Sequence, residues 1–218
     1  MLQRMLIKDL EIQQQETDIH SGQFKVRKRY LKQSTQGDIP GFEAAVYEDL
    51  FNLNETPYLL ETKSSTSNFF QLYSGDENMI HDHANFRSIS EVEGHISLRS
   101  GRLPESNSDV LEVLMTDQAM SYYNMVLDVD YEIVFAREPI KTIKVVGVYT
   151  LSDPRDYYWG DGQIEAMDEV ITLLESDFVQ MDSEEDAFYI TEIIWKRFYD
   201  YYSIEIADVE GIINNALS

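Results

Sequence analysis

The 218-residue sequence contains no cysteine, which excludes disulfide bonds, thiolate metal sites and cysteine nucleophiles. It also lacks any run of about 18 apolar residues, the length that a helix needs to cross a bilayer. Its start, MLQRMLIKDLEIQQQ, has no basic region followed by an apolar core and a small-residue cleavage site, so it does not resemble an export signal. These absences predict either a cytoplasmic protein or a piece of a longer one.

Positive charge is scarce. The chain has 17 Lys and Arg against 40 Asp and Glu, a formal net charge of -23. Such a field repels phosphate backbones, so nucleic acid is not an expected partner. The imbalance is uneven, because residues 1–60 carry 7 − 9 = −2 and the remainder carries 10 − 31 = −21. The one basic cluster, KVRKRYLK at 25–32, either contacts an acidic partner or lipid headgroups or forms a solvated strand face balanced by nearby carboxylates, and we favour the second interpretation.

Apolar residues make up 43% of the chain, which is enough for a hydrophobic core. Their spacing predicts both helices and strands. Helices are expected at 2–17, 41–53, 90–101, 117–124, from 176 onward and at 207–217, and strands at 23–31, 57–65, 68–74, 109–116, 129–136, 140–151, before 176 and at 187–206. Two polar stretches, 75–85 and 152–162, are expected to be loops. The first part of the chain, up to residue 74, has the order β-α-β.

Ser90 could cap the helix at 90–101, with Glu93 at the capping-box position, and Gly101 would close this helix with a left-handed residue. Thr116 or Asp117 would cap the helix at 117–124. A turn at Arg137 to Pro139 would join the strands at 129–136 and 140–151 as a hairpin.

Histidine and carboxylate side chains come together once, in the sequence GDENMIHDHAN. Asp76, Glu77, His81 and His83 are suitable metal ligands by type. Histidines two residues apart in a loop are a weak pattern, however, and His95 is the only other histidine nearby. We therefore predict no metal site and no cofactor.

An aromatic cluster in SDPRDYYWGDG offers a second candidate site. Arg155, Tyr157, Tyr158 and Trp159 could contact a partner, with at least one ring exposed. The alternative is a loop that packs two of its rings into the core. The neighbouring carboxylates Asp153, Asp156 and Asp161 suggest a further hypothesis, a stand-alone hydrolase of cell-wall sugars. A free-standing small-molecule binding protein is a third. No nucleophile elbow, zinc-protease motif or phosphate-binding glycine loop is present.

The longest patterned stretch carries a family resemblance. EVEGHISLRSGRLPESNSDVLEVLMTDQAMSYYNMVLDVDYEIVF followed by IKTIKVVGVY resembles the extracytoplasmic domain of FtsX/MacB-like ABC transporter permeases. The similarity lies in the order of a short helix, a G-R-x-P turn, a polar loop, a strand, a second helix and two further strands. The terminal segments MLQRMLIKDLEIQQQETDIHSGQF and WKRFYDYYSIEIADVEGI look like the stalk and the return strand and helix of such domains.

The resemblance implies an α+β fold. A porter-like α/β lobe, made of 19–94 and 176–218, would hold an inserted strand-rich, sabre-like lobe at 95–175, and residues 1–18 would form a stalk helix. It implies no catalytic residues, so the chain is not expected to be an enzyme.

The implied function is that of a domain on the extracytoplasmic face of the cell membrane. It would bind an extracellular protein or a transported substrate and couple its conformation to a cytoplasmic ATP-binding subunit, through membrane helices that this chain lacks. Pairing with a second copy in the full transporter is also implied.

Overall fold

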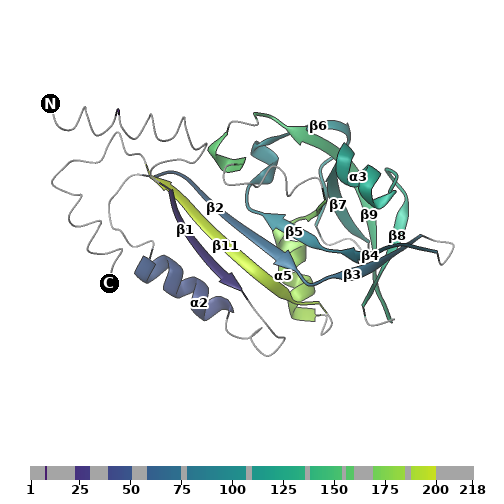
Figure 1. The fold of residues 1–218 in the computed structure, drawn as a ribbon, viewed down its shortest axis with the longest axis horizontal. Coiled ribbons are helices and arrows are strands. Elements are labelled where there is room, and N and C mark those ends of the chain that lie inside the picture. Colours follow the sequence, from purple (N-terminus) through teal and green to yellow (C-terminus); the bar gives the residue numbers. More distant parts are fainter. Residues whose placement is uncertain are drawn as a thin grey trace.

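The computed structural model describes residues 8, 23–29, 39–50, 58–74, 78–106, 110–135, 138–153, 156–159, 169–184 and 188–199. Strands dominate this part of the chain. All eleven strands belong to one mixed sheet with the order β1-β11-β2-β5-β10-β7-β9-β8-β3-β4, and β6 pairs with β9 (Figure 1). The predicted α+β class is therefore wrong, and the fold is a mostly-β one built on a single large sheet.

The strands and helices have the following bounds. The strands are β1 (Gln23–Arg29), β2 (Tyr58–Ser67), β3 (Phe70–Ser74), β4 (Met79–Ala84), β5 (Phe86–Ile89), β6 (Ile96–Gly101), β7 (Leu111–Thr116), β8 (Asp130–Phe135), β9 (Glu138–Leu151), β10 (Ile171–Leu173) and β11 (Ile190–Tyr199). The helical elements are α2 (Ile39–Ala45) with the π-helix η2 (Val46–Leu50), the 3-10 turns η3 (Val92–Gly94) and η4 (Tyr157–Trp159), α3 (Asp117–Tyr123) and α5 (Glu175–Glu184).

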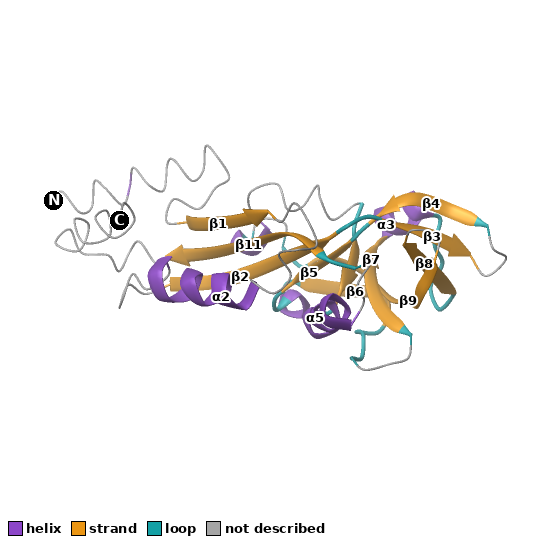
Figure 2. Ribbon diagram, turned by 90° about the horizontal axis from the view of Figure 1, so that it is seen from below, coloured by secondary structure: helices purple, strands orange, loops and turns teal. Residues whose placement is uncertain are grey.

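One end of the sheet is an antiparallel arm made of β1, β11 and β2. Val26 on β1 lies opposite Trp195 on β11, which in turn lies opposite Lys63 on β2. Helices α2 and α5 lie on the same side of the sheet (Figure 2). The ring of Phe42 on α2 contacts Trp195 with centroids 5.6 Å apart. We call this side of the arm the helix-covered face.

Lys63 connects both helices to the helix-covered face. Its Nζ lies 2.8 Å from Glu43 Oε1 on α2 and 3.1 Å from Glu175 Oε1 at the start of α5. Burial alone would lower the pKa of this lysine, but the hydrogen bond to Glu43 and the charges of both carboxylates raise it above its ordinary value. The ammonium group therefore stays charged and holds the two helices over the sheet.

The arm confirms the predicted β-α-β order, but its two strands are not neighbours in the sheet. β1, α2 and β2 follow one another along the chain, and β11 lies between β1 and β2 and pairs antiparallel with both. β1 and β2 therefore run parallel to each other. Periodicity along the chain predicts a strand but not its partner, and β1 and β11 lie more than 160 residues apart in sequence. The pairing is decided by which apolar faces meet in the core.

The other end of the sheet holds the segment that carries the family resemblance. β8 and β9 form the predicted hairpin, although Glu138 and Pro139, expected in its turn, already belong to β9. β9 continues into a parallel pairing with β7 and an antiparallel one with β6. The predicted strands at 109–116, 129–136 and 140–151 are confirmed. The predicted cap of α3 is also confirmed, because Thr116 Oγ1 accepts from the Ala119 N–H at 3.0 Å.

Two local predictions are wrong. Residues 75–85 were expected to be a loop but contain β4, whose strand pairing with β3 outweighs the polar composition. Residues 90–101 were expected to be a helix capped by Ser90, but only 92–94 form a helical turn and β6 follows. Gly101 does have the expected left-handed backbone, with φ of 77°.

The buried side chains form two clusters. The larger one fills the space between the helix-covered face, α3, α5 and the hairpin, and includes Phe70, Phe86, Phe178, Phe188 and Trp195. The smaller one lies against the opposite face of β5 and joins η3 and η4 to the sheet. Its members are Ile89, Val92, Ile96, Leu114, Tyr149, Tyr158 and Trp159.

Several predictions concern regions beyond the part of the chain that the structure describes. Of the predicted stalk helix at 1–18 the structure describes only Lys8, and the final helix at 207–217 lies outside the described residues. The division into a lobe of 19–94 and 176–218 and a lobe of 95–175 stays a prediction, although β10 pairs with β5 on one side and β7 on the other. Across the described ranges, no helix has the length and apolar character that a membrane crossing requires.

Candidate functional site

The aromatic turn at 156–159 is the site that the sequence singles out most clearly. Asp156 closes it, because its Oδ1 accepts from the Tyr158 N–H at 3.0 Å and its carbonyl accepts from the Trp159 N–H at 3.0 Å. This short-range carboxylate contact is typical of Asp in a turn. The turn points two rings inward, since Tyr158 is 0% and Trp159 is 1% exposed.

Tyr158 has a specific set of contacts in the smaller cluster. Its hydroxyl donates to the Ser90 carbonyl at 2.8 Å, and its ring stacks on His95 with centroids 3.7 Å apart. His95 Nδ1 lies 2.7 Å from Asp156 Oδ2. Burial raises the pKa of Tyr158 well above its ordinary value, so the phenol stays protonated and keeps its donor role.

These contacts test one of the two interpretations of the aromatic loop. The alternative in which the loop packs two rings into the core is confirmed, since Tyr158 and Trp159 are core residues. Arg155 and the side chain of Tyr157 lie outside the described residues. Binding of a partner through this turn stays a prediction, and the described side chains have a packing role instead.

The carboxylates of the same loop do not form a described acid–base pair. Both oxygens of Asp156 have partners, the Tyr158 N–H within the turn and His95 outside it. Asp153 is exposed at the end of β9, and Asp161 lies outside the described residues. Asp156 is therefore a residue that organises the turn.

The paired histidines lie on β4. His81 contacts the rings of Tyr122 and Tyr123 of α3, with centroids 5.0 and 4.8 Å away. His83 Nδ1 lies 3.0 Å from Asp82 Oδ1. No group of three or more histidine, cysteine or acidic side chains within the described ranges is arranged to hold a metal ion. Asp76 and Glu77 lie outside those ranges.

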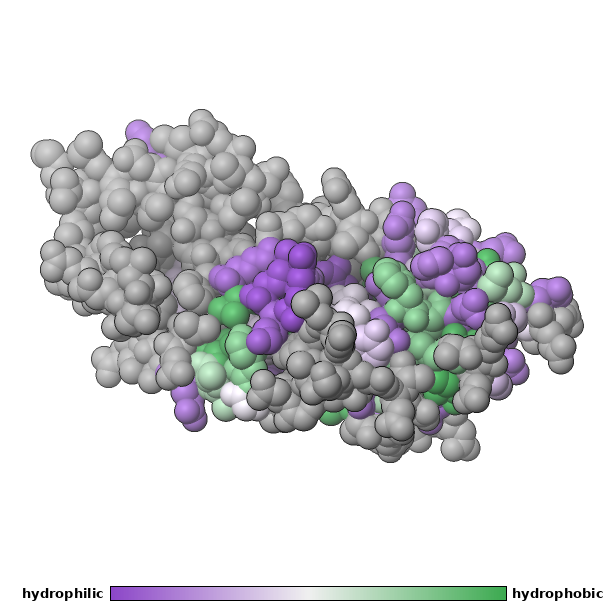
Figure 3. Space-filling model, turned by 60° about the horizontal axis from the view of Figure 1, so that its bottom comes forward, coloured by the Kyte–Doolittle hydropathy of each residue, from purple (hydrophilic) through white to green (hydrophobic). Residues whose placement is uncertain are grey.

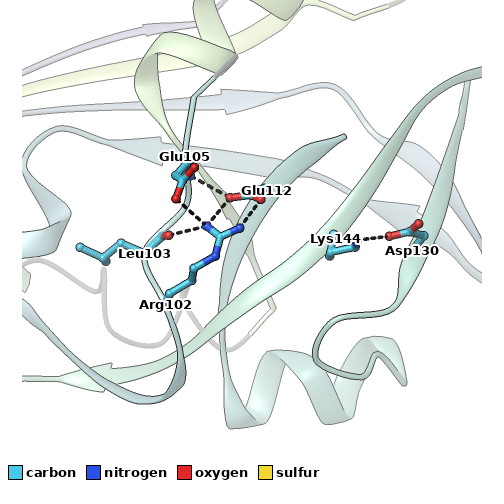
Figure 4. A network of polar contacts seen from close by, with 6 residues as sticks. All are labelled: Arg102, Leu103, Glu105, Glu112, Asp130 and Lys144. Carbon is cyan, nitrogen blue, oxygen red and sulfur yellow. Dashed lines mark hydrogen bonds and ion pairs between the residues drawn. The ribbon is translucent and has the colours of Figure 1, made fainter. Parts of the chain in front are cut away.

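The G-R-L-P turn after β6 is organised by one ion pair (Figure 4). Arg102 Nη1 and Nη2 donate to the two carboxylate oxygens of Glu112 on β7, at 2.6 and 2.5 Å. Arg102 also donates to the Leu103 carbonyl at 3.0 Å, and Glu112 accepts from the Glu105 N–H at 2.8 Å. The hydrogen bonds from Arg102 hold the pKa of Glu112 below its ordinary value. The motif thus stabilises the shape of the loop between β6 and β7.

Two glycines allow the backbones of β6 and β9, which pair antiparallel, to approach closely at this turn. A Cβ on Gly101 would lie 2.0 Å from the Val146 carbonyl oxygen, and one on Gly147 would lie 2.3 Å from the Arg102 carbonyl oxygen. The Arg102 N–H donates to that same Val146 carbonyl at 2.9 Å. Close backbone approach therefore requires glycine at both positions.

A cleft of about 250 Å³ lies between η3 and the start of α5. Glu91, which lines it, has a left-handed backbone with φ of 58°. Ser106 Oγ donates to Asp177 Oδ1 at 2.6 Å and so joins the G-R-L-P loop to α5. The cleft is lined by apolar residues, carboxylates and the hydroxyl side chains of Ser90, Thr172 and Ser176, and it carries no described acid–base pair.

The basic strand 25–32 corresponds to β1 over its described part. Arg29 Nε donates to Glu192 Oε1 at 2.8 Å, and Arg27 Nε lies 3.5 Å from the same oxygen. Lys25, Arg27 and Arg29 are exposed on the face opposite the helices. The predicted solvated strand face with a balancing carboxylate is therefore confirmed for these residues. Figure 3 shows a strongly hydrophilic patch over this part of the sheet.

One residue of interest was missed by the sequence reasoning. Arg87 on β5 is only 9% exposed, and its Nε has no hydrogen-bond partner. The available signal was an arginine within the short apolar strand FRSI, between buried Phe86 and Ile89. A charged residue is rarely buried without a partner.

Known proteins offer little to compare. No protein-family model matches the sequence, and no curated protein matches it. Among solved structures, the chain is similar to a domain of a "putative Permease protein" from Porphyromonas gingivalis, at 12% identity and a TM-score of 0.40, over 78% of this chain and 72% of that one. A likeness at this level carries no argument about function.

Proposed function

We propose that the chain is a non-catalytic extracytoplasmic domain of an ABC transporter permease. In this role it binds an extracellular protein or a transported substrate, and it couples its conformation to a cytoplasmic ATP-binding subunit. The proposal depends on the family resemblance at 91–149.

The observation that supports the proposal is the way in which the segment with the family resemblance, residues 91–149, folds. Its motifs follow one another as β6, the G-R-L-P turn, β7, α3, β8 and β9, and they fold as adjacent strands of one sheet. The side chains that give the motif its character, such as Arg102 and Glu112, contact each other rather than an open site. Side chains that contact each other in this way maintain the shape of the domain surface, and a binding domain requires a surface of fixed shape.

The proposed coupling is mechanical. The long antiparallel arm of β1, β11 and β2 is continuous with the strands of the resembling segment through β5 and β10. A hydrogen-bonded sheet moves as a unit more readily than a set of loops does, so displacement at one end can be transmitted to the other. Pairing with a second copy belongs to the same proposal.

The test is to read the natural gene on both sides of this sequence and to locate its product. We expect membrane helices in the same reading frame, an adjacent gene for an ATP-binding subunit, and cleavage of the domain when protease is added outside intact cells. A gene that encodes no membrane helix, with a product that external protease does not reach, would contradict the proposal. Sugar-binding and hydrolase assays would then follow.

A further inference from the structure

The face of the arm opposite the helices carries a row of aligned side chains. Strand pairing places Arg29 on β1 opposite Glu192 on β11, Glu192 opposite Thr66 on β2, and Thr66 opposite Arg87 on β5. Directly paired residues point to the same side of a sheet. Arg27, two residues before Arg29, lies on that side as well. We call Arg27, Arg29 and Arg87 the arginine row.

Positive charge exceeds negative charge along this row. Three arginines face one carboxylate, a surplus of 3 − 1 = +2 in a chain whose net charge is -23. Glu192 is already shared by Arg27 and Arg29, at 3.5 and 2.8 Å. The charge of Glu192 also acts on Arg87, but from beyond ion-pair distance.

Arg87 differs from the other arginines that the structure describes. Arg27, Arg29, Arg99, Arg102 and Arg197 each have a carboxylate within 4 Å. Arg87 has none within the described ranges, although it is the most buried of them at 9% exposure. Burial lowers the pKa of Arg87, and the charge of Glu192 offsets this effect only in part. A buried guanidinium without an acceptor destabilises a fold.

A second donor without a partner lies on the same side of the sheet. Trp159 is 1% exposed, and its indole Nε1 has no hydrogen-bond partner in the described part of the chain. It packs in the cluster with Ile89, which is two residues from Arg87 on β5. Both groups without a partner are hydrogen-bond donors, so a ligand that binds on this side of the sheet would have to supply a hydrogen-bond acceptor.

We propose that the arginine row is a binding site for an acidic peptide segment of another protein, in which the Arg87 guanidinium donates to the most deeply inserted carboxylate. Guanidinium groups bind carboxylates with two parallel hydrogen bonds, so a carboxylate would satisfy the buried side chain. This proposal does not depend on the chain being part of a permease.

The dimensions favour a segment over a single small anion. Arg87 and Arg29 are three strand spacings apart, about 14 Å, so one small anion cannot reach both. Side chains two residues apart in an extended peptide are separated by about 7 Å. A segment with several carboxylates can therefore contact Arg87 and the outer arginines together.

The overall charge disfavours extended anionic surfaces. An anionic membrane or a nucleic acid would bring negative charge against the rest of a chain with a net charge of -23. A short acidic segment confines its charge to the row. The surplus on the row would also steer such a segment toward it.

The experiment measures fluorescence anisotropy of a labelled peptide of alternating glutamate and serine, with the full chain, at low salt. We expect binding below about 1 mM, weakened about tenfold or more by Arg87→Gln. The matched control is Arg99→Gln, which removes the same charge from an exposed arginine on β6 and should change affinity less than about twofold. Equal losses in the two variants, or no binding by the wild type, would overturn the proposal.

Two further measurements separate the alternatives. Inorganic phosphate and phosphatidylserine vesicles are titrated in parallel, and tighter binding of either than of the peptide contradicts an acidic peptide ligand. Arg87→Met tests whether the chain itself satisfies Arg87. We expect a higher Tm without peptide, because a buried uncompensated charge is removed. A lower Tm or loss of folding would mean that Arg87 has a structural acceptor, and the site would be withdrawn.

Discussion

Arg102 holds both carboxylate oxygens of Glu112 across the loop that joins β6 to β7, at 2.6 and 2.5 Å. The Glu112 side chain is mostly buried, and its carboxylate also accepts a hydrogen bond from the Glu105 backbone N–H. The pair therefore determines the path of the G-R-L-P loop. It explains why this motif needs an arginine, since a lysine cannot form the two parallel hydrogen bonds.

The first prediction follows from that geometry. Arg102→Lys should lower Tm by about 2 to 4 °C, because the fork-like contact with Glu112 is lost. Arg99→Lys is the matched control, since Arg99 makes a single exposed contact with Asp117 at 2.5 Å. Thermal unfolding followed by circular dichroism measures both. Equal Tm values for the two variants would show that the fork does not stabilise the loop.

The second prediction concerns pH. Arg102 lowers the folded-state pKa of Glu112, so this carboxylate contributes stability above its unfolded pKa of about 4.3. The contribution is lost as pH falls through the lower folded pKa. The stability difference between the wild type and Glu112→Gln should be constant from pH 7 to about 5 and should shrink below about 4. Urea unfolding at each pH measures it, and a difference that grows in acid would contradict this assignment.

The third prediction tests the close approach of the β6 and β9 backbones at Gly101 and Gly147. Gly147→Ala should destabilise the fold by about 3 kcal/mol, because the new Cβ would lie 2.3 Å from the Arg102 carbonyl oxygen and 2.6 Å from the Leu114 side chain. Gly101→Ala should destabilise the fold at least as much. The new Cβ would clash with the Val146 carbonyl oxygen, and the alanine would also have to adopt a left-handed backbone conformation.

Gly94→Ala is the control for both glycine variants. A Cβ at Gly94 meets nothing within 4 Å, so stability should stay within about 0.5 kcal/mol of the wild type. Urea midpoints with unchanged slopes give the comparison. If all three alanines behave alike, close backbone approach is not what requires glycine at 101 and 147.

The fourth prediction distinguishes core packing from partner contact in the aromatic turn. Trp159→Ala should destabilise the chain by about 3 to 5 kcal/mol, as expected for a fully buried indole. Tyr158→Phe keeps the ring and removes only the hydroxyl that donates to Ser90, so it should cost about 1 kcal/mol. Denaturant unfolding checks both values. A Trp159→Ala variant as stable as the wild type would show that the indole is not a core residue.

Local chemistry made much of this structure predictable. The strands at β7, β8 and β9 follow the alternation of their apolar residues, and Thr116 caps α3 as its side-chain type predicts. The left-handed Gly101 was also expected. These features depend on residues within a few positions of one another, where propensity and hydrogen-bonding type are decisive.

The candidate site was less predictable for a physical reason. His95 and Asp156 are in contact although 61 positions separate them in the sequence. Arg87 is aligned with Arg29 and Glu192, which belong to strands far away in the sequence. The composition of 75–85 is polar, yet pairing with β3 makes a strand of Met79–Ala84. Cross-strand contacts cannot be read from one strand alone.

The sequence by itself determined the acidic character of the chain, the absence of cysteine chemistry and the position of most described strands, because each depends on composition or on short-range periodicity. Only the tertiary structure decided that those strands form one sheet, that β11 separates β1 from β2, and that the aromatic turn faces inward. The same long-range pairing aligns the arginine row. Burial of apolar surface selects among the pairings that local patterns leave open, and that selection requires the whole chain.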